Sequence, residues 1–318
     1  MSIPAPLPFE NDIHALEQAL SRLEQAADPA QTTEIRRIRK ELDGLLKQKY
    51  ASLSAWETVL VSRHPNRPQT VDYTNMIFDE FVELHGDRAF GDDRALRTGF
   101  ARIGGQKVML IGHQKGKTLK ERQTCFYGCA HPEGYRKALS KMKLAAKYRI
   151  PIICLIDTPG AFPGIGAEER GQALLIATSI LEMSRIETPI ICIVIGEGGS
   201  GGALGIGVGD RVSMLEHAYY SVISPEGCAG ILWKVANEQT KPLAADALKL
   251  TSGHLHKLGV VDDVIDEPLG GAHRNPREMA NILKSYLTRS LRSLIRKPLD
   301  VLMTERYEKF RKMGVFTQ

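Results

Sequence analysis

Two glycine-rich segments, residues 157–166 and 196–202, contain the residue types and spacing that could do chemistry. Each segment follows a continuous apolar run, residues 151–156 and 189–194, and the two runs have nearly the same sequence. Continuous apolar runs are typical of parallel strands that are buried on both faces. Glycine-rich loops that begin helices direct backbone N–H groups toward a shared space, where they can hold negative charge. The pattern therefore predicts an enzyme whose chemistry is done largely by its backbone.

Ser200 lies in a Gly-Gly-Ser-Gly-Gly sequence, which satisfies the G-x-S-x-G pattern of serine hydrolases. A hydrolase also needs a base beside the serine and an acid that orients the base. Five small residues in a row are more simply explained as a turn at which two backbones approach closely. A hydrolase that uses Ser200 stays open as an alternative. The histidines that follow Ser200 are His217, His254, His256 and His273, and nothing in the sequence selects one of them as the base.

Other short motifs narrow the chemistry further. A Gly-Lys-Thr sequence at 116–118 resembles the end of a phosphate-binding P-loop. Such a loop requires a glycine at position 111, where this chain has Ile111, so a P-loop is excluded. Cys125 and Cys129 are too few ligands for zinc and no second pair follows, so no metal site is expected. Asp157 ends a predicted strand, where an acid commonly accepts N–H bonds of its own loop. The remaining glycine loops suit a reaction in which negative charge develops on a carbonyl oxygen.

The bulk composition excludes several classes of protein. The net charge of +5 is spread out and no nucleic-acid-binding motif is present, so no nucleic-acid partner is indicated. No apolar run reaches the ~20 residues of a membrane span. The first ten residues lack the basic and apolar regions of a secretory signal, so a cytoplasmic location is expected. Lys115, Lys117 and Lys120 lie in a polar loop and are candidates for attracting phosphate, although a solvated loop is the favoured explanation.

The predicted elements alternate between strand and helix from residue 97 to 266, which indicates an α/β fold. Helices are expected before and after this region of the sequence, including an N-terminal helical hairpin with a break at Asp28-Pro29. Serine and asparagine caps followed by proline, at Ser224 and Asn275, predict two helix starts. The expected order is a helical hairpin over 10–64, a helix over 70–83, a strand hairpin over 98–103 and 108–112, a polar loop over 113–132, helices over 133–148 and 166–184, short strands over 212–215 and 219–223, and helices over 276–296 and 300–313.

Several long blocks of sequence carry a resemblance to a known family. They read DTPGAFPGIGAEERGQ at 157–172, GEGGSGGAL at 196–204 and SPEGCA at 224–229, with further matches at 85–88, 111–116, 132–138 and 268–274. With these blocks the chain closely resembles the alpha subunits of the bacterial acetyl-CoA carboxylase carboxyltransferase. The resemblance extends from the N-terminal helices to the last helix, and it is far more specific than the short motifs.

The resemblance implies a crotonase/ClpP-like fold, an α/β spiral of repeated ββα units with an N-terminal helical hairpin and C-terminal helices. Residues 1–69 would form the N-terminal helical extension, and residues 70–318 the carboxyltransferase domain with its C-terminal cap. The family pairs with a beta subunit in an α2β2 assembly whose active sites lie at the α–β interface, and zinc is expected only in the beta subunit. A ClpP-like serine hydrolase that uses Ser200 is the alternative within this architecture.

The reaction that the resemblance implies transfers a carboxyl group from carboxybiotin to acetyl-CoA, which gives malonyl-CoA for fatty-acid synthesis. Carboxybiotin would arrive on the biotin carboxyl carrier protein, after loading by biotin carboxylase. In this scheme carboxybiotin loses CO2, the resulting biotin enolate takes a proton from the acetyl methyl group, and the acetyl enolate attacks the CO2. Gly201, Gly202 and Ala203 would donate N–H bonds to the biotin ureido oxygen. The residues expected to wall the biotin pocket are Pro159, Gly160, Phe162, Gly164 and Gly166.

Overall fold

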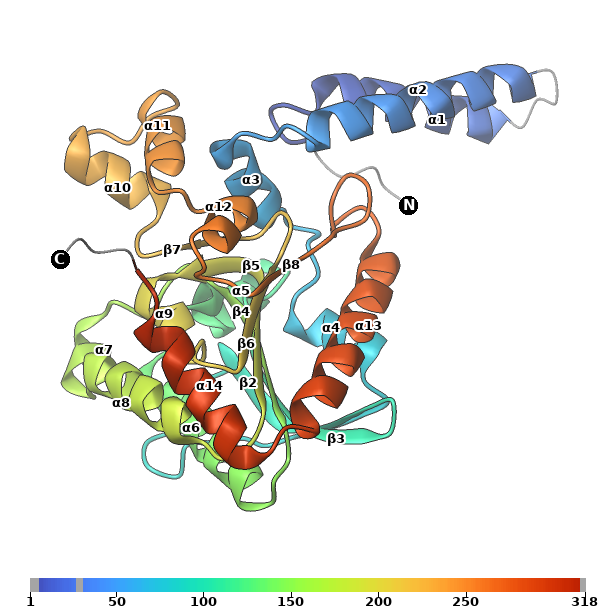
Figure 1. The fold of residues 1–318 in the computed structure, drawn as a ribbon. Coiled ribbons are helices and arrows are strands. Elements are labelled where there is room, and N and C mark those ends of the chain that lie inside the picture. Colours follow the sequence, from blue (N-terminus) through green and yellow to red (C-terminus); the bar gives the residue numbers. More distant parts are fainter. Residues whose placement is uncertain (1–5, 27–30, 315–318) are drawn as a thin grey trace.

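A computed structural model describes residues 6–26 and 31–314, and these residues form one eight-stranded sheet with helices around it (Figure 1). The first three strands pair antiparallel and every later pair is parallel, which is the mixed α/β arrangement predicted from the alternation of elements. The order across the sheet is β1 (Glu80–Glu83), β2 (Leu96–Ile103), β3 (Gln106–His113), β4 (Ile152–Thr158), β5 (Ile190–Gly199), β6 (Arg211–Leu215) and β8 (Asp263–Ile265), and β7 (Tyr219–Ser221) pairs with β5 outside this path.

The two apolar runs of the sequence are β4 and β5, which lie side by side in the middle of the sheet. Every residue of both strands is buried. Equivalent residues of the two runs pair across the ladder, Ile152 with Ile190 and Cys154 with Cys192. Because parallel strands covered on both faces carry such apolar runs, the prediction of twin buried strands is confirmed.

Helices cover both faces of the sheet (Figure 1). Their bounds are α3 Ala55–Ser62, α4 Thr70–Ile77, α5 Leu119–Thr124, α6 Pro132–Lys147, α7 Ile165–Glu169, α8 Gln172–Arg185, α9 Ser200–Leu204, α10 Pro225–Leu232, α11 Thr240–Ala247, α12 Ser252–Lys257, α13 Pro276–Ile295 and α14 Leu299–Arg311. α6, α8 and α14 lie on one side of the sheet, and α4 and α13 lie on the other. Both predicted caps are confirmed, since Ser224 and Asn275 accept backbone N–H bonds at the starts of α10 and α13.

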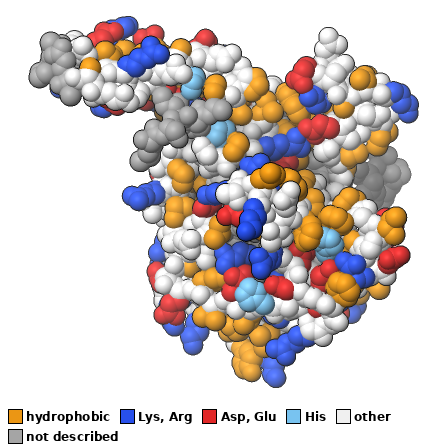
Figure 2. All heavy atoms as spheres, turned by 180° about the vertical axis from the view of Figure 1, so that it is seen from behind, with side chains coloured by type: hydrophobic (Ala, Val, Ile, Leu, Met, Phe, Trp, Pro, Cys, Tyr) orange, Lys and Arg blue, Asp and Glu red, His pale blue; other side chains and the backbone are white. Residues whose placement is uncertain are grey.

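An arm of two helices, α1 (Asn11–Ala26) and α2 (Thr32–Tyr50), projects from this core, as the front and rear views show (Figures 1 and 2). The two helices lie side by side, so the predicted helical hairpin is confirmed. At the base of the arm Ile13, Leu46 and Val61 pack in a small apolar cluster separate from the sheet. The described residues include no helix that is long and apolar enough to cross a membrane.

Two predicted helices differ from the structure, and the predicted break at Asp28-Pro29 lies outside the described residues. The helix expected over 70–83 ends at Ile77, because the residues after it form the edge strand β1 and pair with β2. The helix expected over 166–184 is divided into α7 and α8. Gly171 separates them with a φ of +80°, a left-handed conformation that glycine adopts without strain.

The polar loop expected over 113–132 is more ordered than its composition indicates. It contains α5 and a short 3-10 turn at Phe126–Gly128. Thr118 and Glu121 form a capping box at the start of α5, in which each side chain accepts the backbone N–H of the other residue. Local capping therefore organises a segment that has no apolar periodicity.

Candidate active site

The two glycine-rich loops meet backbone to backbone at the carboxyl ends of β4 and β5. A Cβ atom built on Gly199 would lie 2.1 Å from the carbonyl oxygen of Pro159, and one on Gly202 would lie 2.5 Å from the carbonyl carbon of Gly160. Non-bonded carbon atoms normally stay ~3.5–4.0 Å apart. The structure thus brings the two predicted loops together, and glycine at positions 199 and 202 is what allows this approach.

α9 begins directly after β5, and its first turn contains Gly201, Gly202 and Ala203. The N–H groups in the first turn of an α-helix have no partner within the helix, so they can bind an anion. Ser200 and Gly201 line a cavity of about 340 Å³ beside this turn. The other lining residues are Leu204, Tyr220, Ser221, Val222, Leu248, Leu255 and Val260, which make the cavity mainly apolar. Negative charge that develops on a ligand here would meet backbone donors in surroundings of low polarity, where they act strongly.

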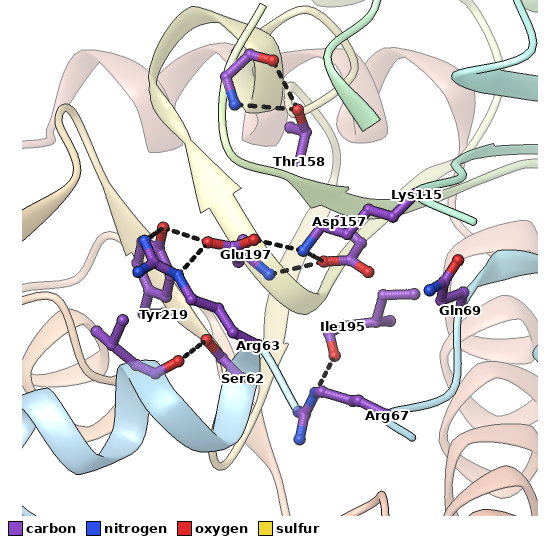
Figure 3. Close-up of polar contacts among 12 residues, drawn as sticks. Ser62, Arg63, Arg67, Gln69, Lys115, Asp157, Thr158, Ile195, Glu197 and Tyr219 are labelled. Atoms are coloured by element: carbon purple, nitrogen blue, oxygen red, sulfur yellow. Dashed lines mark hydrogen bonds and ion pairs between the residues drawn. The ribbon is translucent and has the colours of Figure 1, made fainter. Parts of the chain in front are cut away.

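The loop after β4 is held in shape by its own contacts. Thr158 Oγ1 donates to the carbonyl oxygen of Gly160 at 2.8 Å and accepts the Gly160 N–H at 3.1 Å (Figure 3). The Phe162 ring stacks on His131, with ring centroids 4.0 Å apart. A Cβ atom on Gly164 would lie 2.4 Å from the Phe162 ring, so the glycine leaves room for the ring to fold over the loop. The loop therefore holds the Phe162 ring in place against His131.

Not all of the predicted pocket residues face the same space. Gly160 touches Gly202 directly, as described above. Pro159 lines a second cavity, of about 360 Å³, together with Lys115, Asp157 and Glu197. The α-carbon of Gly166 faces Arg170, because a Cβ atom there would lie 3.1 Å from a guanidinium nitrogen. Of the five predicted pocket residues, Pro159 alone thus lines the polar cavity, and none lines the apolar cavity beside α9.

A buried ionic network joins the ends of β4 and β5 (Figure 3). Lys115 Nζ lies 2.6 Å from Asp157 Oδ1 and 2.5 Å from Glu197 Oε2. Asp157 accepts the backbone N–H of Glu197 at 2.9 Å, so it binds the neighbouring strand. The prediction that Asp157 accepts N–H bonds of its own loop is therefore wrong. Lys115 lies between two carboxylates and Lys117 pairs with Asp72 at 2.6 Å, so neither is an open phosphate-binding group.

The network keeps its charges despite burial. Burial raises the pKa of Glu197, but the opposite charges of Lys115 and Arg63 outweigh burial and hold that pKa at about 2. Burial lowers the pKa of Lys115, and the carboxylates of Asp157 and Glu197 more than reverse this effect. Both groups are therefore ionised at neutral pH.

Two arginines that bind these strand ends were not identified as site residues from the sequence. Arg63 Nε donates to Glu197 Oε1 at 2.6 Å, and Arg67 Nε donates to the carbonyl oxygen of Ile195 at 2.8 Å. Both arginines follow α3, more than a hundred positions before the strand that they contact. The sequence did contain one signal, since Glu197 is the single charged residue among the glycines of 196–202.

Ser200 has the backbone but not the partners of a hydrolase nucleophile. Its φ of +46° is unusual for a residue other than glycine. Within residues 6–26 and 31–314, no hydrogen bond joins Ser200 to a histidine: His254 bonds to Thr251, and His64 stacks on His273. The described structure therefore contains no triad at this serine.

The fold is shared with solved carboxyltransferase structures. Transcarboxylase 12S aligns with a TM-score of 0.55 and 22% identity, over 73% of this chain and 45% of that chain. The beta subunit of geranyl-CoA carboxylase from P. aeruginosa aligns with a TM-score of 0.55 and 19% identity, over 78% of this chain and 46% of that chain. At this identity the likeness shows the fold alone, and it confirms the crotonase-like architecture that was predicted.

Sequence comparisons define the family within this class. The family model described as "Acetyl co-enzyme A carboxylase carboxyltransferase-like" matches residues 6–314. Proteins called acetyl-coenzyme A carboxylase carboxyl transferase subunit alpha are 62% identical in Rhodopirellula baltica and 50% identical in Methylococcus capsulatus, and each alignment covers 98% of both chains. The chain belongs to the family of acetyl-coenzyme A carboxylase carboxyl transferase alpha subunits. The resemblance stated from the sequence is confirmed, and the comparisons give no support to a serine hydrolase.

Proposed function

We propose that this chain supplies one half of the active site that carboxylates acetyl-CoA to malonyl-CoA. The carboxyl donor is carboxybiotin, a substrate delivered by the biotin carboxyl carrier protein after biotin carboxylase has loaded it. The observation that carries the proposal is the contact of the two glycine loops, which holds the first turn of α9 beside an apolar cavity. The names of the full-length relatives support acetyl-CoA as the acceptor.

The N–H groups of Gly201, Gly202 and Ala203 are proposed to hold the ureido oxygen of biotin. That oxygen gains negative charge when the carboxyl group leaves, and oriented N–H donors stabilise such charge without reorganising. Biotin itself then takes the proton from the acetyl methyl group, so the chain needs no side-chain base. The remaining task of the chain is to pack around the biotin rings. We assign this task to Pro159, Gly160, Phe162, Gly164 and Gly166, which form the loop that contacts α9 or continue it.

A partner subunit is proposed to complete the site. Val222 is 78% exposed and also lines the apolar cavity, so a partner that covers Val222 would close the cavity. Ile231 and Leu232 of α10 are exposed as well, and a group of exposed apolar side chains commonly marks an interface. We propose that the partner is the beta subunit, in an α2β2 assembly, and that it carries the zinc and the oxyanion hole for the acetyl enolate.

The division of the chain and its location remain predictions. We propose that residues 1–69 act as a helical extension and residues 70–318 as the carboxyltransferase domain. The arm formed by α1 and α2 supports an extension, since its apolar cluster is separate from the sheet core, whereas Arg63 and Arg67 of the same segment contact β5. The cytoplasmic location expected from the sequence stays a prediction.

The proposal is tested by measuring malonyl-CoA formation from acetyl-CoA and carboxybiotin. Three samples are assayed: the chain alone, the beta subunit alone, and the two subunits co-expressed. We expect activity only in the mixture, because each subunit contributes a different oxyanion hole. A stable complex that forms no malonyl-CoA would overturn the proposal.

A further inference from the structure

The strand that leads into the first turn of α9 is irregular just before the glycines. In the ladder between β4 and β5, Ile156 pairs with Val194, whereas Thr158 pairs with Gly198. Two steps along β4 therefore correspond to four steps along β5. A bulge of this kind removes regular ladder hydrogen bonds and leaves backbone groups that need other partners. The irregular segment is Ile195–Gly196–Glu197.

Charged side chains bind the backbone groups of this irregular segment (Figure 3). The carbonyl oxygen of Ile195 accepts a hydrogen bond from Arg67 Nε at 2.8 Å. The N–H of Glu197 donates to Asp157 Oδ1 at 2.9 Å. A Cβ atom on Gly196 would lie 2.4 Å from the same carboxylate oxygen, so Asp157 also packs tightly against the segment. On the side of β5 that faces β4, side chains thus replace the regular ladder along Ile195–Gly196–Glu197. On the other side, the ladder with β7 continues over Glu197, Gly198 and Gly199.

The side chain of Glu197 is fixed from three directions. Lys115 Nζ approaches one carboxylate oxygen at 2.5 Å, while Arg63 Nε and the Tyr219 hydroxyl donate to the other at 2.6 and 2.8 Å. These partners come from the loop after β3, from the end of α3 and from β7 (Figure 3). Lys115 bonds to Asp157 as well, so a single ammonium group joins the ends of both strands.

We propose that Lys115 and Glu197 are positioning residues for carboxyl transfer, which set the place of the Gly201 and Gly202 N–H groups by fixing the irregular segment of β5. Neither side chain touches the substrate in this account. The inference rests on the proposed function of these N–H groups. Backbone donors stabilise a transition state only when they are held in the productive geometry, and small displacements cost large factors in rate.

The test uses the complete complex with the beta subunit and the substitution Lys115→Met. Methionine keeps much of the volume of lysine but removes the ammonium group, so the carboxylates of Asp157 and Glu197 face each other without a cation between them. We expect kcat to fall by about 10- to 100-fold. The KM for acetyl-CoA should change by less than about twofold, because the oxyanion hole for the acetyl group is proposed to lie in the beta subunit.

Lys309→Met is the matched control. Lys309 is as exposed as Lys115, at 17%, and its Nζ lies 2.8 Å from Asp262. It also donates to the carbonyl oxygen of Asp210, which precedes β6 and so lies at the opposite end of the parallel strands from Glu197. We expect this substitution to lower stability while kcat stays unchanged. An equal fall of kcat in both variants would show a general structural effect and overturn the proposal.

Coupling to Gly202 separates this inference from the proposed function. If Lys115 acts through the N–H donors, the combined variant Lys115→Met with Gly202→Ala should lose less activity than the product of the two single losses. If the single variants Gly202→Ala and Gly202→Val both keep normal activity, the proposed function itself is contradicted. Normal activity of Lys115→Met beside an impaired Gly202→Val would overturn only the positioning role. If Lys115→Met fails to assemble, Glu197→Gln tests the positioning role instead. We expect its kcat to fall by about tenfold, and an unchanged kcat would contradict the proposal.

Discussion

Replacing Gly202 by valine is expected to lower kcat for malonyl-CoA formation by about 100- to 1,000-fold. A Cβ atom at position 202 would lie 2.5 Å from the carbonyl carbon of Gly160 and 2.6 Å from the backbone nitrogen of Ala161. Because both neighbours are backbone atoms, the two loops must move apart, and the N–H donors move with them. The free energy of unfolding should fall by only about 1–3 kcal/mol, the usual cost of inserting methyl groups into a packed site. Activity is measured in the α–β complex, and stability by urea denaturation.

The control for this substitution is Gly253→Val in α12. Apart from its chain neighbours and the backbone of its own helix, no atom lies within 4 Å of a Cβ atom built on Gly253, so valine fits there without moving the chain. We expect turnover and stability close to those of the unsubstituted complex. Near-normal turnover of the Gly202→Val complex would mean that the first turn of α9 does not stabilise the reacting oxygen.

The substitution Arg306→Met should cause the largest loss of stability. Arg306 of α14 is fully buried, and its guanidinium donates to the carbonyl oxygens of Met183, Ile186 and Thr188 at the end of α8. It also forms two hydrogen bonds to the carboxylate of Asp210, at 2.7 and 2.8 Å. Methionine would leave this carboxylate and the carbonyl oxygens buried without a cation. We expect the free energy of unfolding to fall by about 3–5 kcal/mol in urea denaturation.

Lys312→Met, at the residue that directly follows α14, provides the comparison. Lys312 is 76% exposed and pairs with Glu308 at 3.3 Å, so water already solvates both groups. Exposed pairs of this kind contribute little, and the change should stay within about 0.5 kcal/mol. Equal losses for Arg306→Met and Lys312→Met would show that the buried arginine does not anchor α14.

The parts of the site that could be predicted are those that depend on local sequence. The runs at 151–156 and 189–194 predicted β4 and β5, because strands buried on both faces need continuous apolar residues. The glycines after them predicted that two backbones meet, which the contact of Gly202 with Gly160 shows. The caps at Ser224 and Asn275 could be predicted for the same reason, since each cap acts within one helical turn.

The parts that could not be predicted depend on contacts between distant segments. Arg63 reaches Glu197 across 134 positions, and Lys115 reaches it across 82 positions. No periodicity or spacing relates such residues, so Lys115 could be interpreted only as a loop cation. The edge strand β1 has the same cause: its four residues become a strand because β2 offers a partner, not because their sequence excludes a helix.

The position of biotin in the α–β complex tests the central claim most directly. We would determine the structure of the complex with a biotinylated carrier domain bound and measure the distance from the biotin ureido oxygen to the backbone nitrogens of Gly201 and Gly202. We expect hydrogen-bond distances of about 2.7–3.1 Å to at least one of these nitrogens, with the biotin rings against the loop that carries Phe162. A ureido oxygen held only by the beta subunit, or by a side chain of this chain, would contradict it.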